Sequence, residues 1–334
     1  MNSLKTIDIH AHILPEETIR QLQQTAPSLG LKLSPLDEGS AVLEIAGVTQ
    51  KPFPRGAWDL EWRLRDMDRS GVDIQLLSNT PQSFLYDQEA SLGAACAAIQ
   101  NDRIAAIVGK HAARFLGLAT LPMQAPELAA RELRRAMGPL GLLGFHLASH
   151  IQGRNLDDPN LAPVWEAAQE LGAFVLIHPF KVAAMDRLKS YYLKNLIGNP
   201  LETTIAAACL IFGGVIERYP RISFCFSHGG GFAPYQAGRF IHGWNVRPEP
   251  KQFLAEGPAE SLGRLYYDTI LHSDRMLETL IENVGASRVM LGSDYPFDMG
   301  YYEGVRQVRS LPIAAGDQAL ILGDTARELL GLKS

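Results

Sequence analysis

The chain contains little cysteine, and none of it forms a disulfide framework or a metal-binding C-x-x-C pair. Its three cysteines, Cys96, Cys209 and Cys225, are far apart and each has apolar neighbours. Buried free thiols fit this pattern better than disulfide bonds do. Free thiols are typical of reducing compartments, and we find no signal peptide before the first expected strand, which starts at Thr6. We therefore expect a cytoplasmic protein.

Excess positive charge and long apolar runs are also missing. The 31 basic residues are outnumbered by 36 acidic ones, which gives a formal net charge of -5. Nucleic acids and membrane surfaces bind concentrated positive charge, so we expect neither as a partner. The longest apolar run, Ile205 to Ile216, is shorter than the ~20 residues that cross a bilayer. Hydrophobic residues make up 46% of the chain, as is usual for a soluble globular protein.

Short apolar runs alternate with helical segments along the whole chain. Several of the runs are apolar on both faces, which is typical of parallel strands covered by helices. Helical segments such as Leu60–Ser70, Pro126–Met137, Leu161–Leu171 and Asp274–Val284 each end at a glycine. This alternation predicts an α/β fold, a (β/α)₈ TIM barrel that forms one domain over residues 1–334. The eight expected strands are Thr6–His12, Val72–Ser78, Phe115–Leu121, Leu143–Ser149, Phe174–Phe180, Ile222–His228, Leu265–Ile270 and Arg288–Tyr295.

Two connections are too long for the bare repeat. Residues 13–57 form an insertion after the first strand, with a small β excursion over Leu31–Phe53 that includes Ala41–Ile45 as one strand. Residues 181–200 form a second long loop, whose lysines, Lys194 among them, are expected to form a solvated face. Both follow carboxyl ends of strands, where barrels carry their chemistry, so we expect lids or pocket walls. The tail is expected to close as a helix over Asp324–Leu332, with Asp324 as its N-cap.

The strongest chemical signal is the pair His10 and His12 at the end of the first strand. Side chains alternate along a strand, so the two imidazoles face the same side, the barrel axis. Two buried imidazoles need partners for four ring nitrogens, and a metal ion that binds the inward nitrogens is one solution. On its own, this pair is equally compatible with two separately satisfied histidines.

Three further strands also end in a polar residue, namely His178, His228 and Asp294. Four such strand ends on one barrel make separate structural roles improbable. Three neutral imidazoles (His10, His12 and His178) and the Asp294 carboxylate suit Zn²⁺ with an open position, and Mn²⁺ or Co²⁺ are alternatives. His228 is then a base, an acid or a charge stabiliser, and Asp294 acts in catalysis as well as in metal binding.

The sequence resembles the amidohydrolase superfamily, and within it the metal-dependent decarboxylases typified by 2-amino-3-carboxymuconate 6-semialdehyde decarboxylase. The matching stretches run in order from residue 8 to residue 297. They are Asp8-Ile9-His10-Ala11-His12, Trp58-Asp59, Met67-Asp68, Gly71-Val72-Asp73, Leu156-Asp157-Asp158, Ile177-His178-Pro179, Ser227-His228-Gly229-Gly230-Gly231 and Met290-Leu291-Gly292-Ser293-Asp294-Tyr295-Pro296-Phe297.

The resemblance implies a TIM barrel with one zinc-type ion held by the four residues above, His228 as the catalytic histidine, and a homodimer. It also implies loss of CO₂ from an unsaturated or aromatic acid, a small-molecule carboxylate substrate. Arg239 matches an arginine that reaches the carboxylate of a neighbouring subunit's substrate. Lys51 stands where the type member has a carboxylate-binding arginine, with Arg55 close by. The other substrate-binding residues implied are Phe180 and Tyr192, where the type member has tryptophans, and Phe297.

Two routes of decarboxylation stay open. In one, His228 deprotonates water, which adds to a conjugated carbon before CO₂ leaves; in the other, the ion and His228 polarise the substrate itself. A hydrolase of an amide or lactone is the main alternative, because the superfamily also contains hydrolases. A barrel that binds a metal without turnover is a second alternative. Released CO₂ separates the decarboxylase from the hydrolase.

Two more polar residues lie on expected strands. His146 alternates away from its neighbours on the fourth strand, so we expect it to be structural. Asp268, at the end of the seventh strand, is expected to accept a hydrogen bond from a metal ligand or to cap the backbone.

Overall fold

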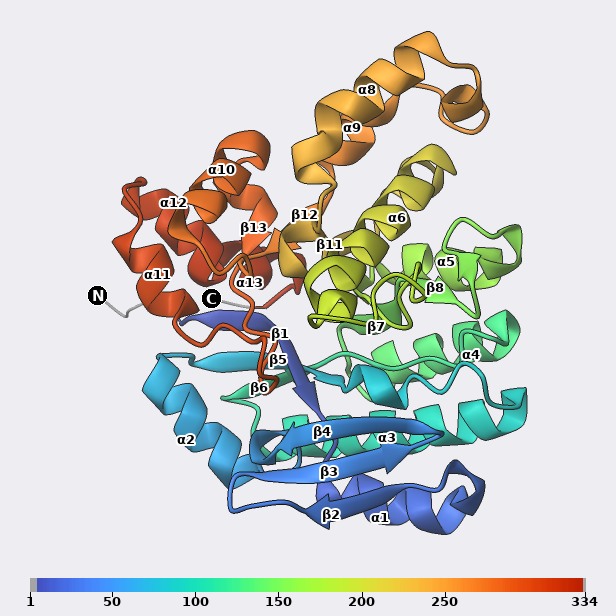
Figure 1. Ribbon diagram of the computed structural model, residues 1–334, viewed down its shortest axis with the longest axis vertical. Helices are drawn as coiled ribbons and strands as arrows, with labels where there is room; N and C mark the ends of the chain where they lie inside the picture. Colours follow the sequence, from blue (N-terminus) through green and yellow to red (C-terminus); the bar gives the residue numbers. More distant parts are fainter. Residues whose placement is uncertain (1–4, 333–334) are drawn as a thin grey trace.

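The computed structural model describes residues 5–332, and its core is a set of eight parallel strands with helices around them (Figure 1). The strands form two hydrogen-bonded sheets, in the orders β1-β5-β6 and β13-β12-β11-β10-β7. Their bounds are β1 (Ile7–Ile13), β5 (Ile74–Asn79), β6 (Phe115–Gly117), β7 (Gly144–Ala148), β10 (Phe174–His178), β11 (Ser223–Phe226), β12 (Tyr266–Asp268) and β13 (Val289–Met290).

Backbone hydrogen bonds join the two sheets at both edges. On one side Ile9 N donates to Leu291 O at 2.9 Å, which links β1 to the segment after β13. On the other side Ala119 N donates to Gly144 O at 2.9 Å, and His146 N donates to Ala119 O at 2.8 Å. The eight strands therefore close into a ring, and the expected (β/α)₈ barrel is confirmed.

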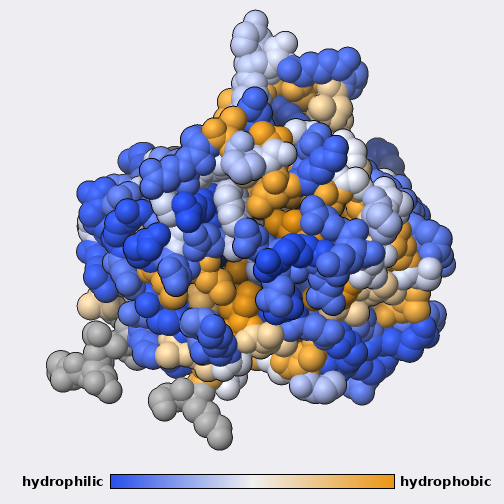
Figure 2. Space-filling model, turned by 90° about the horizontal axis from the view of Figure 1, so that it is seen from below, coloured by the Kyte–Doolittle hydropathy of each residue, from blue (hydrophilic) through white to orange (hydrophobic). Residues whose placement is uncertain are grey.

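Apolar residues on the two faces of the strands explain why these segments pair in parallel. In β10, Phe174 and Leu176 belong to a cluster with Ile7 and Ile9 of β1, inside the barrel. The alternate residues of β10 belong to the larger cluster that packs against the helices. Charged and polar side chains cover most of the face seen in Figure 2, with hydrophobic ones exposed between them. Burial of both strand faces is the arrangement that the apolar runs predicted.

Thirteen α-helices are described, and most of them cover the outside of the barrel. Four coincide with expected segments to within one residue. The helices are α1 (Glu16–Thr25), α2 (Leu60–Ser70), α3 (Ala90–Lys110), α4 (Pro126–Met137), α5 (Ala162–Leu171), α6 (Asn199–Phe212), α7 (Val215–Arg218), α8 (Ala237–Val246), α9 (Pro258–Gly263), α10 (Asp274–Val284), α11 (Gly304–Ser310), α12 (Ala315–Ala319) and α13 (Thr325–Leu329).

The insertion after β1 contains a three-stranded antiparallel sheet, as expected. It is formed by β2 (Lys32–Pro35), β3 (Ser40–Ile45) and β4 (Val48–Pro54), in that order. In Figure 1 this sheet lies at one end of the molecule, whereas α8 and α9 project at the opposite end. A minor two-stranded ladder, β8 (His150–Ile151) with β9 (Arg154–Asn155), follows β7.

The structure corrects two expectations about the chain after β10. Residues 181–200 are not all loop, because a π-helical turn over Lys194–Gly198 leads directly into α6. The helical stretch Lys194–Phe212 is therefore long and apolar enough, by length and composition alone, to cross a membrane. A helix that packs on a barrel passes the same test, and Ala206, Leu210 and Ile211 of α6 are buried in the main core.

The tail also differs from the sequence expectation. Asp324 ends a π-helical turn over Leu320–Asp324, and its side chain caps no backbone N–H of α13. Its carboxylate instead accepts a hydrogen bond from Arg327 Nη1 at 3.0 Å. Gly323, inside this turn, has a non-helical backbone (φ 176°, ψ -24°), so the chain kinks just before α13.

Candidate metal centre

Four polar side chains meet at the end of the barrel where the strands terminate. His10 and His12 extend from β1, His178 is the last residue of β10, and Asp294 follows β13. One nitrogen or oxygen atom of each lies within 4.8 Å of the other three, and all four residues are buried. The structure thus brings together the four residues that the sequence indicated as metal ligands.

An irregularity in β1 directs His10 toward this group. The register of β1 against β5 shifts between Asp8 and Ala11. Ile9 lies in the cluster inside the barrel, and the ring of the next residue, His10, lies 5.2 Å from that of His178. Strict alternation would turn His10 away from the side of Ile9. The shift, as at a β-bulge, allows both side chains to face inward.

In each of the three imidazoles, a hydrogen-bond acceptor lies beside Nδ1. A proton on Nδ1 leaves the lone pair of Nε2 free to point into the site. The contacts are His10 Nδ1 to Asp268 Oδ2 (2.7 Å), His178 Nδ1 to the Pro179 carbonyl (2.8 Å), and His12 Nδ1 to Ser78 Oγ (3.1 Å) and the Asn79 carbonyl (3.3 Å).

With each imidazole neutral and protonated on Nδ1, the four atoms that face the site are all acceptors. Nε2 of His10 and Nε2 of His12 are 3.0 Å apart. Asp294 Oδ1 lies 3.3, 3.1 and 3.8 Å from Nε2 of His10, His12 and His178. Within residues 5–332, His178 Nε2 and Asp294 Oδ1 are buried without any hydrogen-bond partner. Ligands of a tetrahedral ion are about 3.3 Å from one another when the bonds are about 2.0 Å. The donor set fits one divalent cation.

The charges in the site agree with this interpretation. Burial lowers the pKa of His12 to about 4 and the pKa of His178 to about 3, so both imidazoles are neutral at pH 7. Burial opposes ionisation of Asp294, but His10, His12 and His178 hold its pKa well below the usual value. Burial also disfavours charge on His10, yet Asp294 and Asp268 raise its pKa to about 10. A cation would replace that proton between His10 and Asp294.

His228 lies at the edge of this group. Its Nε2 is 3.3 Å from Asp294 Oδ2, the carboxylate oxygen not closest to the other histidines. The backbone φ is +55° at both His228 and Asp294, a conformation that costs free energy in non-glycine residues and is concentrated at functional sites. Gly231 follows with φ +61°, and a Cβ there would lie 2.2 Å from the Pro200 carbonyl oxygen. Only glycine allows this close approach.

Asp268 connects the two parts of the site. Its Oδ2 accepts from His10 Nδ1 at 2.7 Å and from the backbone N–H of His228 at 2.9 Å. Its Oδ1 accepts from the backbone N–H groups of Gly229 at 2.8 Å and Ile270 at 3.1 Å. Burial would raise the pKa of Asp268, but these hydrogen bonds and the charge of His10 lower it. Asp268 fills both roles that the sequence left open, an acceptor for a candidate ligand and a backbone cap.

A cavity of about 340 Å³, here called the cationic chamber, opens next to His178 and Asp294. Of the predicted substrate-binding residues, Lys51, Phe180, Tyr192 and Phe297 line it. Lys194 lines it too, and its side chain is exposed, as the sequence indicated. That assignment missed the cavity because the π-helical turn that carries Lys194 has no sequence signal.

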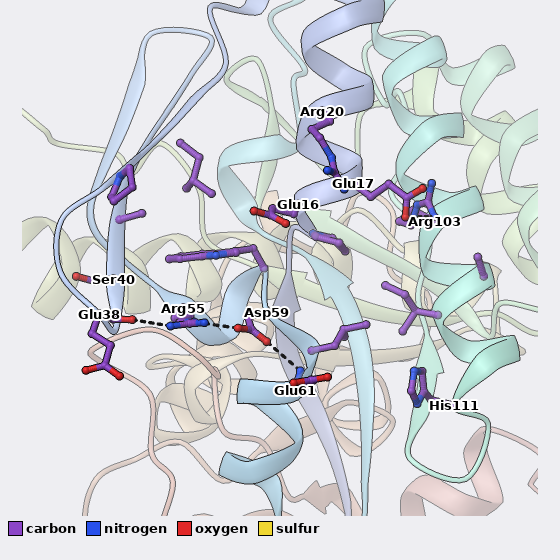
Figure 3. A pocket seen from close by; sticks show the side chains of 18 of the residues that line it. Glu16, Glu17, Arg20, Glu38, Ser40, Arg55, Asp59, Glu61, Arg103 and His111 are labelled. Atoms are coloured by element: carbon purple, nitrogen blue, oxygen red, sulfur yellow. Dashed lines mark hydrogen bonds and ion pairs between the residues drawn. The ribbon is translucent and has the colours of Figure 1, made fainter.

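Two predicted substrate-binding arginines lie elsewhere. Arg55 lines a separate surface pocket, where its Nε donates to Asp59 Oδ2 at 2.9 Å and its Nη1 to the Glu38 carbonyl at 3.1 Å (Figure 3). Arg239 is exposed on α8, which projects from the barrel in Figure 1. Arg55 is therefore not near the site, because Asp59 at the start of α2 pairs with it. Arg239 is not among the residues that line the cationic chamber of its own chain.

A second cavity of about 340 Å³, here called the apolar chamber, lies on the other side of His228. Asn195, Asn199 and Met299 line both chambers. The remaining lining residues are Leu196, Pro200, His228, Gly231, Phe232, Tyr235, Ile270, Leu271, His272 and Met276. Sequence reasoning missed this chamber, since its residues come from four separate segments, 195–200, 228–235, 270–276 and 299.

His146 is closer to the site than the sequence indicated. Its side chain is fully buried, and its ring lies 5.1 Å from that of His12, 5.5 Å from that of His178 and 4.7 Å from that of Phe84. Neither ring nitrogen has a hydrogen-bond partner within residues 5–332. Burial lowers the pKa of His146 well below the usual value, so the imidazole is neutral. It forms part of the wall behind two candidate ligands.

Comparisons with known proteins agree on one family. A family model described as amidohydrolase matches residues 7–332. The chain is 37% identical over 332 residues to the 2-amino-3-carboxymuconate-6-semialdehyde decarboxylase of Dictyostelium discoideum, covering 99% of this chain and 92% of that protein. The crystal structure of 5-carboxyvanillate decarboxylase from Sphingomonas paucimobilis superposes with a TM-score of 0.83 at 26% identity, over 99% of this chain and 100% of that one. Dihydroxybenzoic acid decarboxylase from Polaromonas sp. JS666 was solved with manganese and 2-nitroresorcinol. Its structure superposes with a TM-score of 0.80 at 24% identity, over 98% of this chain and 97% of that one.

Proposed function

Because this chain belongs to the amidohydrolase family, we propose that it is a metal-dependent, non-oxidative decarboxylase of an unsaturated or aromatic carboxylic acid. The observation that carries this function is the 37% identity to a semialdehyde-acid decarboxylase over nearly the full length of both proteins. The four acceptor atoms at the barrel end supply the chemistry that such a reaction needs. The bond between the carboxyl carbon and its neighbour breaks, CO₂ leaves, and the electron pair left on carbon takes up a proton.

We propose His10, His12, His178 and Asp294 as the residues that hold the ion. Three neutral nitrogens and one carboxylate favour Zn²⁺. Manganese in the Polaromonas decarboxylase makes Mn²⁺ the first alternative to test, followed by Co²⁺. When bound, such an ion acts as a Lewis acid toward a substrate oxygen or water. His178 Nε2 and Asp294 Oδ1 are buried without a hydrogen-bond partner within residues 5–332, which makes a metal site a better explanation than a hydrogen-bonded cluster.

His228 is the proposed proton-transfer residue. Asp294 is ionised, so Asp294 Oδ2 accepts from a proton on His228 Nε2 across 3.3 Å. The proton is thus held beside the cavity where the substrate binds. Asp268 fixes the backbone of His228, and Asp294 fixes its ring, so little reorganisation accompanies transfer of the proton. Asp294 is proposed to act in catalysis through this contact as well as through metal binding.

The substrate is proposed to lie in the cationic chamber. Lys51 supplies positive charge, and Phe180, Tyr192 and Phe297 supply apolar or aromatic surface for an unsaturated or ring-shaped acid. Lysine is a point charge, whereas the type member's arginine offers two parallel donors. We therefore propose a substrate that differs from 2-amino-3-carboxymuconate 6-semialdehyde.

Arg239 is proposed to act in a homodimer, where it reaches the substrate carboxylate of the neighbouring subunit. Its exposure on a projecting helix leaves it free to contact another chain.

A cytoplasmic location is proposed from the three cysteines, all of which are free.

Product analysis tests the function. Purified protein loaded with Zn²⁺ or Mn²⁺ is incubated with unsaturated semialdehyde acids, hydroxybenzoates, and lactones or amides. The proposal expects CO₂ only from the acids. Ring-opened acids or two fragments, with no CO₂, would identify a hydrolase instead, and metal binding without any turnover would identify a binding protein.

A further inference from the structure

The groups proposed for catalysis separate two chambers of opposite character. His178 and Asp294 line the cationic chamber, and His228 lines the apolar chamber. His228 Nε2 and Asp294 Oδ2 are only 3.3 Å apart, so a molecule in contact with both reaches each chamber. Asn195 and Met299 border both cavities.

Three lysines, Lys51, Lys181 and Lys194, line the cationic chamber together with two carboxylates, the proposed metal ligand Asp294 and Asp298. Lys51 and Lys194 have no ion pair and no side-chain hydrogen bond within residues 5–332, whereas Lys181 pairs with Asp87. Both residues are exposed, and both line the cavity beside His178 and Asp294, where unpaired ammonium groups attract an anionic ligand. Lys194 follows the strand that carries His178, and its placement depends on the π-helical turn before α6.

No aspartate, glutamate, lysine or arginine lines the apolar chamber. Three of its residues, Leu196, Phe232 and Met276, are among the chain's most exposed large apolar side chains, at 48%, 38% and 41%. Exposed apolar side chains that converge on a cavity beside a reactive group are typical of a ligand-binding surface. Their position next to His228 makes the substrate the occupant that the geometry favours.

We propose that the substrate is an amphipathic acid, with its anionic groups toward Lys51 and Lys194 and an apolar substituent in the apolar chamber. This inference rests on the proposed decarboxylase function. It adds Lys194 as a substrate-binding residue, and it assigns Leu196 and Met276 to specificity for the substituent.

A series of acids tests both parts of this proposal, the site for the anionic groups and the site for the apolar substituent. Metal-loaded protein is titrated calorimetrically with 2-hydroxybenzoate and its 6-methyl, 6-ethyl and 6-propyl derivatives, and CO₂ release is measured from the same acids. Each added carbon is expected to tighten Kd about three- to fourfold, the effect of burying one methylene group. Leu196→Ser and Met276→Ser are expected to reduce this increment. Phe253→Ser, at a 64% exposed site outside both chambers, is the matched control and keeps the increment.

A second experiment tests the anionic site by substituting two lysines of the same segment. Lys194→Gln is expected to weaken binding of every acid in the series about tenfold, since an ammonium–carboxylate contact is lost. Lys189→Gln, which alters an exposed lysine outside the cavity, is expected to leave Kd unchanged. If the two substitutions changed Kd equally, Lys194 would not be a substrate-binding residue.

Different outcomes would contradict the amphipathic substrate and the proposed decarboxylase activity. CO₂ release with no dependence of Kd on chain length would overturn the amphipathic substrate and leave the decarboxylase. Chain-length dependence without CO₂ from these acids, or from the unsaturated semialdehyde acids of the functional test, would overturn the decarboxylase and leave the binding site. If Leu196→Ser and Met276→Ser dissociate a dimer and leave the increment unchanged, a second copy of the chain occupies the apolar chamber and the inference is wrong.

Discussion

Asp268 is the residue through which the proposed ligands and His228 are coupled. One carboxylate oxygen accepts from both His10 Nδ1 and the backbone of His228, and the other accepts from Gly229. A neutral amide cannot accept at both positions with the same strength, and it places a donor where an acceptor is needed. Loss of this carboxylate therefore disturbs both a ligand's tautomer and the position of the catalytic histidine.

Asp268→Asn is expected to lower metal affinity about 10- to 100-fold, the usual effect of removing the partner of a ligating histidine. Competition with a chromophoric chelator measures the change. Asp186→Asn, at an exposed position in the loop after β10, serves as the control and keeps wild-type affinity. Unchanged affinity in Asp268→Asn would show that His10 needs no carboxylate to bind the ion.

His228→Ala is expected to reduce kcat on the order of 10²–10⁴-fold, because the residue holds the transferable proton. Metal content stays at one equivalent, since the four proposed ligands are intact. His242→Ala, on the exposed face of α8, is the matched control with normal kcat. Metal analysis and steady-state rates on the same preparation decide the matter: a metal-free His228→Ala protein would make His228 a ligand.

Sequence reasoning reached the candidate ligands because each is the polar end of an apolar strand. It did not reach His146, since alternation along one strand says nothing about which layer of a closed barrel a side chain occupies. It also placed Arg55 near the substrate, because Arg55 is close to Lys51 in the sequence. The ion pair with Asp59 turns Arg55 toward a different pocket.

Among the elements, β1 shows a limit of pattern analysis. Alternation predicted that His10 and His12 share a side, and both do reach the site. The apolar residue Ile9 also faces inward, however, because the register against β5 shifts between Asp8 and Ala11. A shift of this kind depends on both partner strands and cannot be read from one of them.

Four helices that are followed by a glycine were predicted to within one residue, whereas α3 (Ala90–Lys110) was not predicted, although the Glu89 side chain caps its first turn. The Asp59 side chain caps α2, and Gly71 ends it in the left-handed conformation. In α3 the sequence is rich in alanine, so apolar residues occur on all sides and no stripe marks a buried face.

Removal of the α2 cap is expected to destabilise the protein by about 1 kcal/mol. In the wild type, Asp59 Oδ1 accepts from Glu61 N and Trp62 N at 3.0 Å each. Asp59→Ala loses both hydrogen bonds, and urea denaturation of the metal-loaded protein measures the difference. Glu38→Ala, which keeps the Glu38 carbonyl that Arg55 contacts, is the control with little change.

The effect of Asp59→Ala should depend on pH. Partial burial would raise the pKa of Asp59, but hydrogen bonds from Trp62 and Arg55 lower it in the folded protein. A depressed carboxylate pKa contributes stability above the unfolded value of about 3.9, and this contribution is lost as pH falls through the folded pKa. The stability difference between wild type and variant should shrink below about pH 4. A difference that grows in acid would contradict the cap.

For the whole molecule, the barrel was predictable because eight apolar strands, each followed by a helix, leave few other ways to bury both strand faces. The projecting α8 and the two chambers were not predictable, since they depend on contacts between segments that are distant in sequence. The composition of each segment gives no information about which other segments it meets.

The proposed homodimer makes a prediction about complementation. If Arg239 completes the site of its neighbour, Arg239→Ala and His228→Ala are both nearly inactive as homodimers. In a co-expressed mixture, each heterodimer carries one site with both wild-type residues, which restores about a quarter of the activity for random pairing. Rates and the mass of the purified assembly are measured together. A mixture that is dimeric but inactive, or a fully active Arg239→Ala enzyme, would exclude this role.

The central claim is that an ion at the four strand-end residues is required for the loss of CO₂. The most direct test follows a ¹³C-carboxyl-labelled acid in D₂O, with protein stripped by a chelator and protein reloaded with Zn²⁺. The account predicts one labelled CO₂ for each product molecule, deuterium on the carbon that lost the carboxyl group, and turnover only after reloading. Product that retains the label and has gained water, or equal CO₂ release from the stripped protein, would contradict it.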